Sequence, residues 1–147
     1  MAAVRHLFRA EVRRLPMQEV REALLVEGLG VAGCAHSSRG GNRQVLLIDQ
    51  ESLDAMQLAP GVVRENITTE GLAVNALPLG QRLRVGQTLI EVAAVCTPCD
   101  QLEKVRPGLR REIRGRRGML CRVLEGGLVR AGDRIEKVPS AVEVEAT

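Results

Sequence analysis

The cysteine at position 99 stands where a thiol can bind a metal ion or carry sulfur. It ends the segment Cys-Thr-Pro-Cys at residues 96–99, which follows an expected strand. We expect residues 100–106 to be helical, with Pro107 as the stop. The N-terminus of a helix favours negative charge, and the thiolate is the reactive and metal-binding form of cysteine. This position therefore predicts a reactive thiolate at Cys99.

The spacing of Cys96 and Cys99 is compatible with more than one kind of site. A structural zinc ion needs four ligands, and the sequence has no second paired Cys or His motif to complete such a site. A thioredoxin-like redox pair needs a βαβ context that the sequence does not indicate, although a disulfide between the two thiols is sterically plausible. The alternation of apolar residues along 88–96 places Cys96 on the buried face of a strand.

Residues 64–71, Arg-Glu-Asn-Ile-Thr-Thr-Glu-Gly, gather a guanidinium, an amide and two hydroxyls in a short stretch. Arg64 is suited to a phosphate group, and the Asn66 amide offers a donor and an acceptor to the edge of a polar heterocycle. The alternative is a loop in which the Asn66 and Thr68 side chains satisfy the local backbone. Composition alone leaves both interpretations open.

Two other polar segments are candidates for binding. Residues 33–44 form a polar loop with Cys34 and His36 that can serve as a pocket lid, and the lack of a partner near Cys34 in sequence argues against a metal site there. Six arginines between Arg106 and Arg117 predict a solvated face, a phosphate-facing role for one or two of them, or a docking face for a donor protein. No nucleic-acid recognition module accompanies them.

The pattern of the 147 residues favours a mainly β domain. Short alternating or β-branched segments recur between glycine-rich breaks, and many short strands with few helices favour a closed barrel, which has no exposed edges. Hairpin turns are expected at residues 86–87 and 126–127, and a helix at residues 49–57. The expected strands are residues 4–10, 20–26, 44–48, 66–68, 82–85, 88–96, 119–125 and 134–138.

Composition restricts the class of protein further. Phe8 is the only aromatic residue, so the core must be aliphatic, and the stacking platforms of single-stranded nucleic-acid binders are missing. No apolar run approaches the length of a membrane span, and the first residues lack the apolar stretch of a secretory signal. We therefore expect a cytoplasmic protein with reduced cysteines and without a membrane or nucleic-acid partner. Residues 1–138 are expected to form one domain, and residues 139–147 a flexible tail.

Several short segments occur in an order that is specific to one family. They are Arg43-Gln44-Val45, the Arg-Glu-Asn-Ile-Thr-Thr-Glu-Gly-Leu run at 64–72, Leu79-Gly80, Val85-Gly86, Pro98-Cys99 and Gly132-Asp133-Arg134-Ile135. This order resembles the MOSC domain, which is named for the C-terminal domain of molybdenum-cofactor sulfurase. The resemblance covers about Val20 to Val138, and residues 7–15 are similar to the N-terminal strand region that precedes the domain in larger members.

The resemblance implies a mainly β fold with a few short helices, built as a closed or partly closed barrel related to the β-barrel domain of pyruvate kinase. It also implies a pocket for the pterin form of the molybdenum cofactor. In that family the cysteine that matches Cys99 is the proposed sulfur carrier or the thiolate ligand of molybdenum. Arg64 and Asn66 match family positions associated with the cofactor. The other residues expected to bind it are Thr68, His36 and Arg13.

The resemblance leaves several functions open. One is a molybdenum-dependent oxidoreductase that reduces N-hydroxylated compounds with electrons from a separate protein. Another is a sulfur transferase in which a separate desulfurase loads Cys99 with sulfur. A noncatalytic binding module and a Cys96/Cys99 redox pair are the alternatives. Cys34 stands where family members typically carry an acidic residue, and this departure can retune the pocket, supply a second thiol or mark a copy that binds ligand without turnover.

Overall fold

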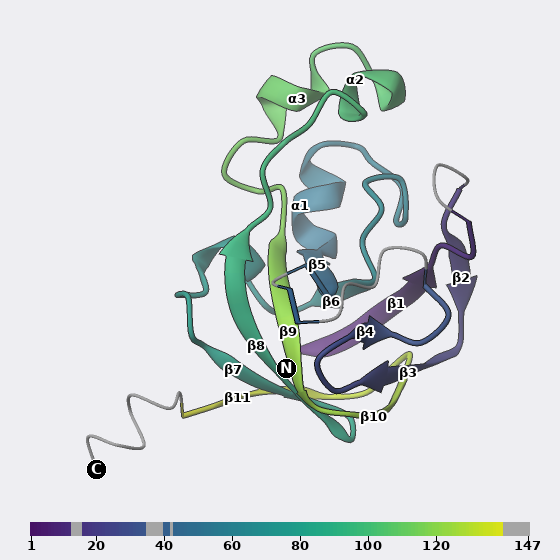
Figure 1. The fold of residues 1–147 in the computed structure, drawn as a ribbon. Coiled ribbons are helices and arrows are strands. Elements are labelled where there is room, and N and C mark those ends of the chain that lie inside the picture. Colours follow the sequence, from purple (N-terminus) through teal and green to yellow (C-terminus); the bar gives the residue numbers. More distant parts are fainter. Residues whose placement is uncertain (13–15, 35–39, 42, 140–147) are drawn as a thin grey trace.

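The computed structural model describes residues 1–12, 16–34, 40–41 and 43–139, and its strands form two sheets (Figure 1). The larger sheet has the strand order β11-β7-β8-β9-β5-β6-β1-β2, and the smaller sheet the order β10-β3-β4. The strands of the larger sheet are β1 (Ala3–Arg9), β2 (Gln18–Val20), β5 (Val45–Asp49), β6 (Ile67–Glu70), β7 (Arg82–Val85), β8 (Thr88–Val95), β9 (Met119–Glu125) and β11 (Ile135–Val138). Those of the smaller sheet are β3 (Glu22–Val26), β4 (Gly30–Val31) and β10 (Gly127–Arg130).

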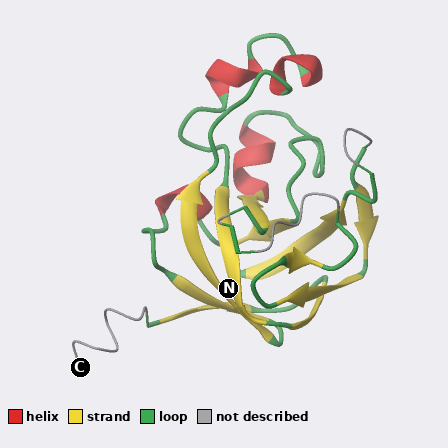
Figure 2. Cartoon of the chain, in the orientation of Figure 1, coloured by secondary structure: helices red, strands yellow, loops and turns green. Residues whose placement is uncertain are grey.

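The mainly β class expected from the sequence is confirmed, but the sheets are not closed into a barrel (Figure 2). The chain bends at Arg21 and divides the expected strand at 20–26 into β2, which pairs with β1, and β3, which pairs with β10 in the other sheet. One isolated bridge joins Ala3 of β1 to Arg134, which precedes β11. It connects strands near the opposite edges of the larger sheet. The expected barrel is therefore formed only in part.

The two expected hairpins have different outcomes. β7 and β8 form the hairpin turned at residues 86–87, with Val85 opposite Thr88. The hairpin expected at 126–127 is not formed, because β10 pairs with β3 and β9 pairs with β5 and β8. A Cβ atom at Gly126 would lie 2.6 Å from the carbonyl oxygen of Leu25, so the missing side chain lets the chain cross from one sheet to the other.

The helices are few and short. α1 (Gln50–Ala55) begins where the sequence predicts, because the Asp49 carboxylate accepts the Ser52 N–H at 3.0 Å. After Cys99 the chain forms two four-residue helices, α2 (Leu102–Val105) and α3 (Leu109–Glu112), in place of the single expected one. A 3₁₀ helix, η1, spans Val74–Ala76. In the described part of the chain, no helix has the length and apolar character to cross a membrane.

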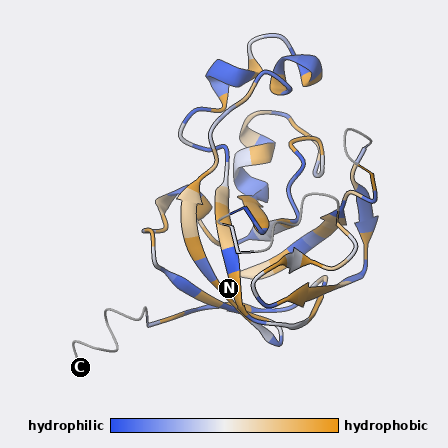
Figure 3. Cartoon of the chain, viewed as in Figure 1, coloured by the Kyte–Doolittle hydropathy of each residue, from blue (hydrophilic) through white to orange (hydrophobic). Residues whose placement is uncertain are grey.

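Apolar packing fixes the place of the segment that carries α2 and α3. The main core contains residues of both sheets and is built almost entirely from aliphatic side chains. A second cluster joins α1 to α2 and α3 through Leu53, Met56, Leu102, Leu109 and Ile113. Figure 3 shows that α2 and α3 are hydrophilic over much of their length. These few apolar side chains therefore anchor an otherwise polar segment over α1.

Candidate functional site

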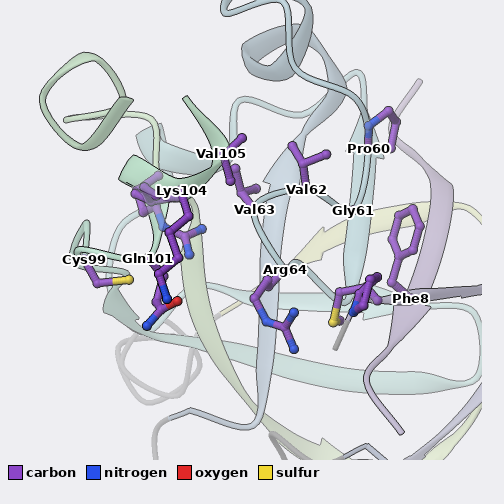
Figure 4. Close-up of a pocket in the computed structure, with 14 residues that line it drawn as sticks. Phe8, Pro60, Gly61, Val62, Val63, Arg64, Cys99, Gln101, Lys104 and Val105 are labelled. Atoms are coloured by element: carbon purple, nitrogen blue, oxygen red, sulfur yellow. The ribbon is translucent and has the colours of Figure 1, made fainter. Parts of the chain in front are cut away.

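A cavity of about 540 Å³ lies between residues 60–64, α2 and the end of β1 (Figure 4). Its volume is within the range of small-molecule and cofactor sites. Apolar groups form most of its wall, and cationic side chains and one thiol line the rest. The lining residues are Phe8, Pro16, Met17, Pro60, Gly61, Val62, Val63, Arg64, Cys99, Gln101, Leu102, Lys104, Val105 and Arg117.

The ladder between β8 and β9 places Cys99 at this cavity. Its last pair is Val95 with Met119, and one residue further the Cys96 N–H donates to the Gly118 carbonyl oxygen at 3.1 Å. The segment between Cys96 and Gly118, which carries α2 and α3, leaves the sheet after Cys96 and returns to it at Gly118. Cys99 lies just after the exit and is exposed, whereas the other three cysteines of the chain are buried. The thiol predicted to be reactive is therefore the accessible one.

The helix after Cys99 differs from the prediction in a way that concerns the thiol. α2 begins at Leu102 with Gln101 as its N-cap, and not at residue 100. The N–H groups from Leu102 to Lys104 already donate to the carbonyl oxygens three residues earlier. The expected set of unpaired N–H groups beside the Cys99 sulfur is thus not formed. The cationic side chains Arg64, Lys104 and Arg117 line the same cavity as Cys99.

Cys96 is buried, as its place on the strand predicts, and packs in a small cluster with Leu46 and Leu120. Burial raises the pKa of the Cys96 thiol, and the nearby Arg117 guanidinium opposes that shift. Both Cys96 and Cys99 are free thiols in this structure. The two cysteines therefore occupy different environments, one inside the protein and one on the cavity.

Arg64 reaches the cavity from an unusual backbone conformation. Its φ of 68° lies in the left-handed region, which is unfavourable for a residue with a side chain. The buried carboxylate of Glu65 holds the turn, because its Oε2 accepts the Gly61 N–H at 2.9 Å and the Thr68 hydroxyl at 2.7 Å. Figure 4 shows Arg64 at the same cavity as Cys99. Thr68 is fully buried and does not line the cavity, but its hydroxyl supports the turn that carries Arg64. A direct contact between Thr68 and a cofactor stays a prediction.

Asn66 is also buried, and protein groups use its side chain. Its Oδ1 accepts the Leu46 N–H at 3.0 Å, and its Nδ2 donates to the Phe8 carbonyl oxygen at 3.3 Å and to the Cys34 sulfur at 3.6 Å. The same sulfur accepts the Ala10 N–H at 3.4 Å. These bonds join β5 to β1, the two neighbours of β6, and neither Asn66 nor Cys34 lines the cavity. A direct contact between Asn66 and a cofactor stays a prediction.

The remaining predicted residues, Arg13 and His36, lie outside the described residues. Sequence reasoning missed Lys104 as a lining residue and did not identify which arginine of the cluster would reach the cavity. That arginine is Arg117, which is only 7% exposed. Its place just before β9, beside the residue that bonds to Cys96, is the signal that could have identified it.

Comparison with known protein families decides the family of this chain. The family model of the MOSC domain matches residues 35–136, which is more than half of the sequence. The chain belongs to the MOSC domain family. MOSC domains are in general related to the molybdenum cofactor. A comparison with curated proteins gave no match.

Solved structures show the same MOSC fold at low sequence identity. The YuaD protein from Bacillus subtilis superposes with a TM-score of 0.78 at 20% identity, over 92% of this chain and 94% of that one. YiiM from Geobacillus stearothermophilus gives a TM-score of 0.79 at 18% identity, over 95% of this chain and 76% of that one. YiiM from Escherichia coli gives 0.68 at 23% identity, over 93% and 71%.

The cavity of this MOSC domain fits a molybdenum-bearing pterin in three respects. Cys99 offers a sulfur ligand, the soft donor type that can bind molybdenum. Arg64 and Arg117 offer guanidinium groups for a phosphate, and the apolar wall can cover a ring. Arg117 in particular carries buried nitrogen atoms without a hydrogen-bond partner among the described residues. Among the residues that the structure describes, no group of three or more His, Cys, Asp or Glu side chains is arranged to hold a metal ion.

Proposed function

We propose that this MOSC domain binds the pterin form of the molybdenum cofactor in the cavity, with Cys99 as the thiolate ligand of molybdenum or as a sulfur carrier. The observation that carries the proposal is that the exposed cysteine shares a cavity with two arginines and an apolar wall. Each of these groups recognises a different part of such a ligand: the thiol its metal or sulfur, the arginines its phosphate, and the wall its ring.

The residues of the cavity divide into contact and support roles. Cys99 contacts the metal or the transferred sulfur, and Arg64 contacts the phosphate. Glu65 and Thr68 hold the turn that presents Arg64, and Asn66 joins the strands on which that turn depends. Arg13 and His36 remain candidate contacts on sequence grounds.

The chemistry of the bound site follows one of two courses. The cofactor, when bound, would supply two-electron redox chemistry at molybdenum toward N-hydroxylated compounds, and a separate protein would supply the electrons. In the sulfur-carrier course, Cys99 holds sulfur as a persulfide that a separate desulfurase has loaded. In both courses the exposure of Cys99 is what allows the second protein or the substrate to reach it.

The test is to purify the full chain, anaerobically, from a host that makes the cofactor. Molybdenum is measured by elemental analysis and pterin by fluorescence after oxidation. We expect both in the wild-type protein, and we expect Cys99→Ser to lose molybdenum or persulfide labelling by at least tenfold. Absence of both molybdenum and pterin from the wild-type protein would refute the proposal.

Cys96→Ser is the matched control, because it makes the same chemical change three residues away at a buried position. It should keep the cofactor and lower the free energy of unfolding by about 1–3 kcal/mol, since a buried hydroxyl replaces an apolar thiol. Equal loss of function in both variants would favour a Cys96/Cys99 redox pair instead.

A further inference from the structure

We propose that Arg117 is a built receptor for a phosphate-type oxyanion at this cavity. The binding of the anion rests on the geometry of Arg117 alone. Only the identity of the molecule that carries the phosphate rests on the proposed function. Free phosphate and the phosphate group of a pterin cofactor share this chemistry, and the experiment below distinguishes them.

The burial of Arg117 is the first observation. The residue is 7% exposed, and its Nε and Nη1 atoms are buried without a hydrogen-bond partner among the described residues. Arginine is almost never buried unless it is paired, because removal of a charge from water costs several kcal/mol. Arg117 also lines the cavity. A buried guanidinium without a carboxylate partner therefore lies in the wall of a cavity where a ligand fits.

Two other arginines of the same cluster are paired with carboxylates. Arg106 donates to the Met56 carbonyl oxygen at 2.9 Å and pairs with Glu112 at 2.7 Å. Arg110 pairs with Asp100. No carboxylate within the described ranges forms an ion pair with Arg117. Arg106 and Arg110 thus use carboxylates of the protein, and Arg111, Arg114 and Arg116 are exposed, whereas Arg117 is buried without a carboxylate partner among the described residues.

A tetrahedral oxyanion supplies what Arg117 lacks. Its oxygen atoms accept hydrogen bonds from a guanidinium, and its negative charge neutralises the positive charge of the buried side chain. Arg64 and Lys104 line the same cavity and add two further cations to its wall. The Cys99 thiol therefore shares its cavity with cations that fix the orientation of a phosphate-bearing ligand.

Replacement of Arg117 should raise the melting temperature without the anion and should remove the stabilisation that the anion gives to the wild-type protein. In the absence of ligand, the unpaired buried charge opposes folding, so Arg117→Met should raise the melting temperature of the cofactor-free protein by a few degrees. In the presence of the anion, wild-type protein gains stability by mass action and the variant does not. A residue with a purely structural role would lower the melting temperature when it is replaced.

The experiment is thermal unfolding of cofactor-free protein against inorganic phosphate, with sodium chloride matched for ionic strength. We expect 10 mM phosphate to raise the melting temperature of the wild-type protein by roughly 3–6 °C. Arg117→Met should show no such rise. Arg116→Gln is the control, because it removes one positive charge from the adjacent exposed residue, and it should respond as the wild type does. Arg117→Lys, which keeps the charge but loses the fork, should reduce the apparent affinity at least fivefold, and this variant decides the question if Arg117→Met does not fold.

The outcomes separate this proposal from the proposed function. An equal phosphate response in wild type and Arg117→Met, or no response in the wild type, overturns the anion receptor. A wild-type protein that responds to phosphate through Arg117 but is purified without molybdenum and pterin supports the receptor and refutes the cofactor. If Arg117→Met also loses at least tenfold of the retained pterin, the phosphate that Arg117 binds belongs to the cofactor.

Discussion

The backbone N–H of Cys96 donates to the carbonyl oxygen of Gly118, and this bond closes the base of the segment that carries both Cys99 and Arg117. It continues the register of β8 and β9 by one residue beyond the pair of Val95 with Met119. An exposed thiol and a buried guanidinium, which are far apart in sequence, therefore reach one cavity. The chemistry of the cavity depends on the register of this ladder.

The first prediction concerns Gly118, whose carbonyl oxygen accepts the bond from Cys96 that closes the base of this segment. Gly118 has a φ of 105°, and a Cβ atom there would overlap the carbonyl oxygen of Leu47. We expect Gly118→Ala to lower the free energy of unfolding by about 3 kcal/mol, because it combines backbone strain with a clash against a sheet backbone. Gly115→Ala is the matched control, since Gly115 has a φ of 81° but open space around it, and it should cost about 1 kcal/mol. Chemical denaturation measures both, and equal costs would contradict the closure argument.

The second prediction separates strain from binding at Arg64. Glycine removes the penalty of the left-handed conformation, so Arg64→Gly should leave the free energy of unfolding unchanged or raise it by up to about 1 kcal/mol. The same variant should lose most of the bound cofactor, because it removes a cation from the cavity. Gln57, with a φ of 56° and an exposed side chain, is the control, and Gln57→Gly should change stability in the same way without loss of ligand. Full cofactor content in Arg64→Gly would rule out its phosphate contact.

The third prediction tests whether Asn66 supports the strands or contacts a ligand. Asn66→Ala leaves the Leu46 N–H and the Phe8 carbonyl oxygen without their buried partner. We expect a loss of about 1–3 kcal/mol in the free energy of unfolding, with cofactor content falling only in proportion to the unfolded fraction. Normal stability combined with complete loss of cofactor would instead show direct contact, as the family resemblance implies.

The fourth prediction is a pH dependence at the segment that joins α2 to α3. The Glu103 carboxylate accepts the N–H groups of Arg110 at 2.9 Å and Gly108 at 3.1 Å, and these bonds hold the pKa of Glu103 below its normal value of 4.5. A carboxylate with a lowered pKa in the folded state stabilises the protein above its normal pKa, and this contribution is lost as the pH falls through the lowered value.

We therefore expect the difference in unfolding free energy between wild type and Glu103→Gln to be constant above about pH 5.5 and to shrink below it. Urea titrations between neutral and acidic pH measure this difference. A difference that grows as the pH falls would show that the carboxylate is not held by these bonds.

Local features of the sequence were enough to predict much of the fold. The capping carboxylate of Asp49, the turn at residues 86–87 and the buried strand position of Cys96 each depend on neighbouring residues alone. The change of sheet at Arg21 and at Gly126 could not be predicted in the same way. A strand that continues and a strand that turns into a second sheet show the same alternation, and only long-range pairing distinguishes them.

For the site, residue type and family resemblance singled out Cys99 and Arg64. The structure places both at one cavity, and their roles toward a cofactor stay predictions. The burial of Arg117 was not predictable from composition, because a run of arginines normally faces solvent. Its burial results from the register that places it beside the closure at Gly118, which is a property of the assembled sheet.

Native mass spectrometry of the full chain, purified anaerobically from a host that makes molybdenum cofactor, tests the central claim most directly. We expect a wild-type species heavier than the polypeptide by the mass of one molybdenum-bearing pterin, and we expect Cys99→Ser to lose the molybdenum from that species. A wild-type spectrum that shows only the mass of the polypeptide, from a host whose own molybdenum enzymes are active, would contradict the account.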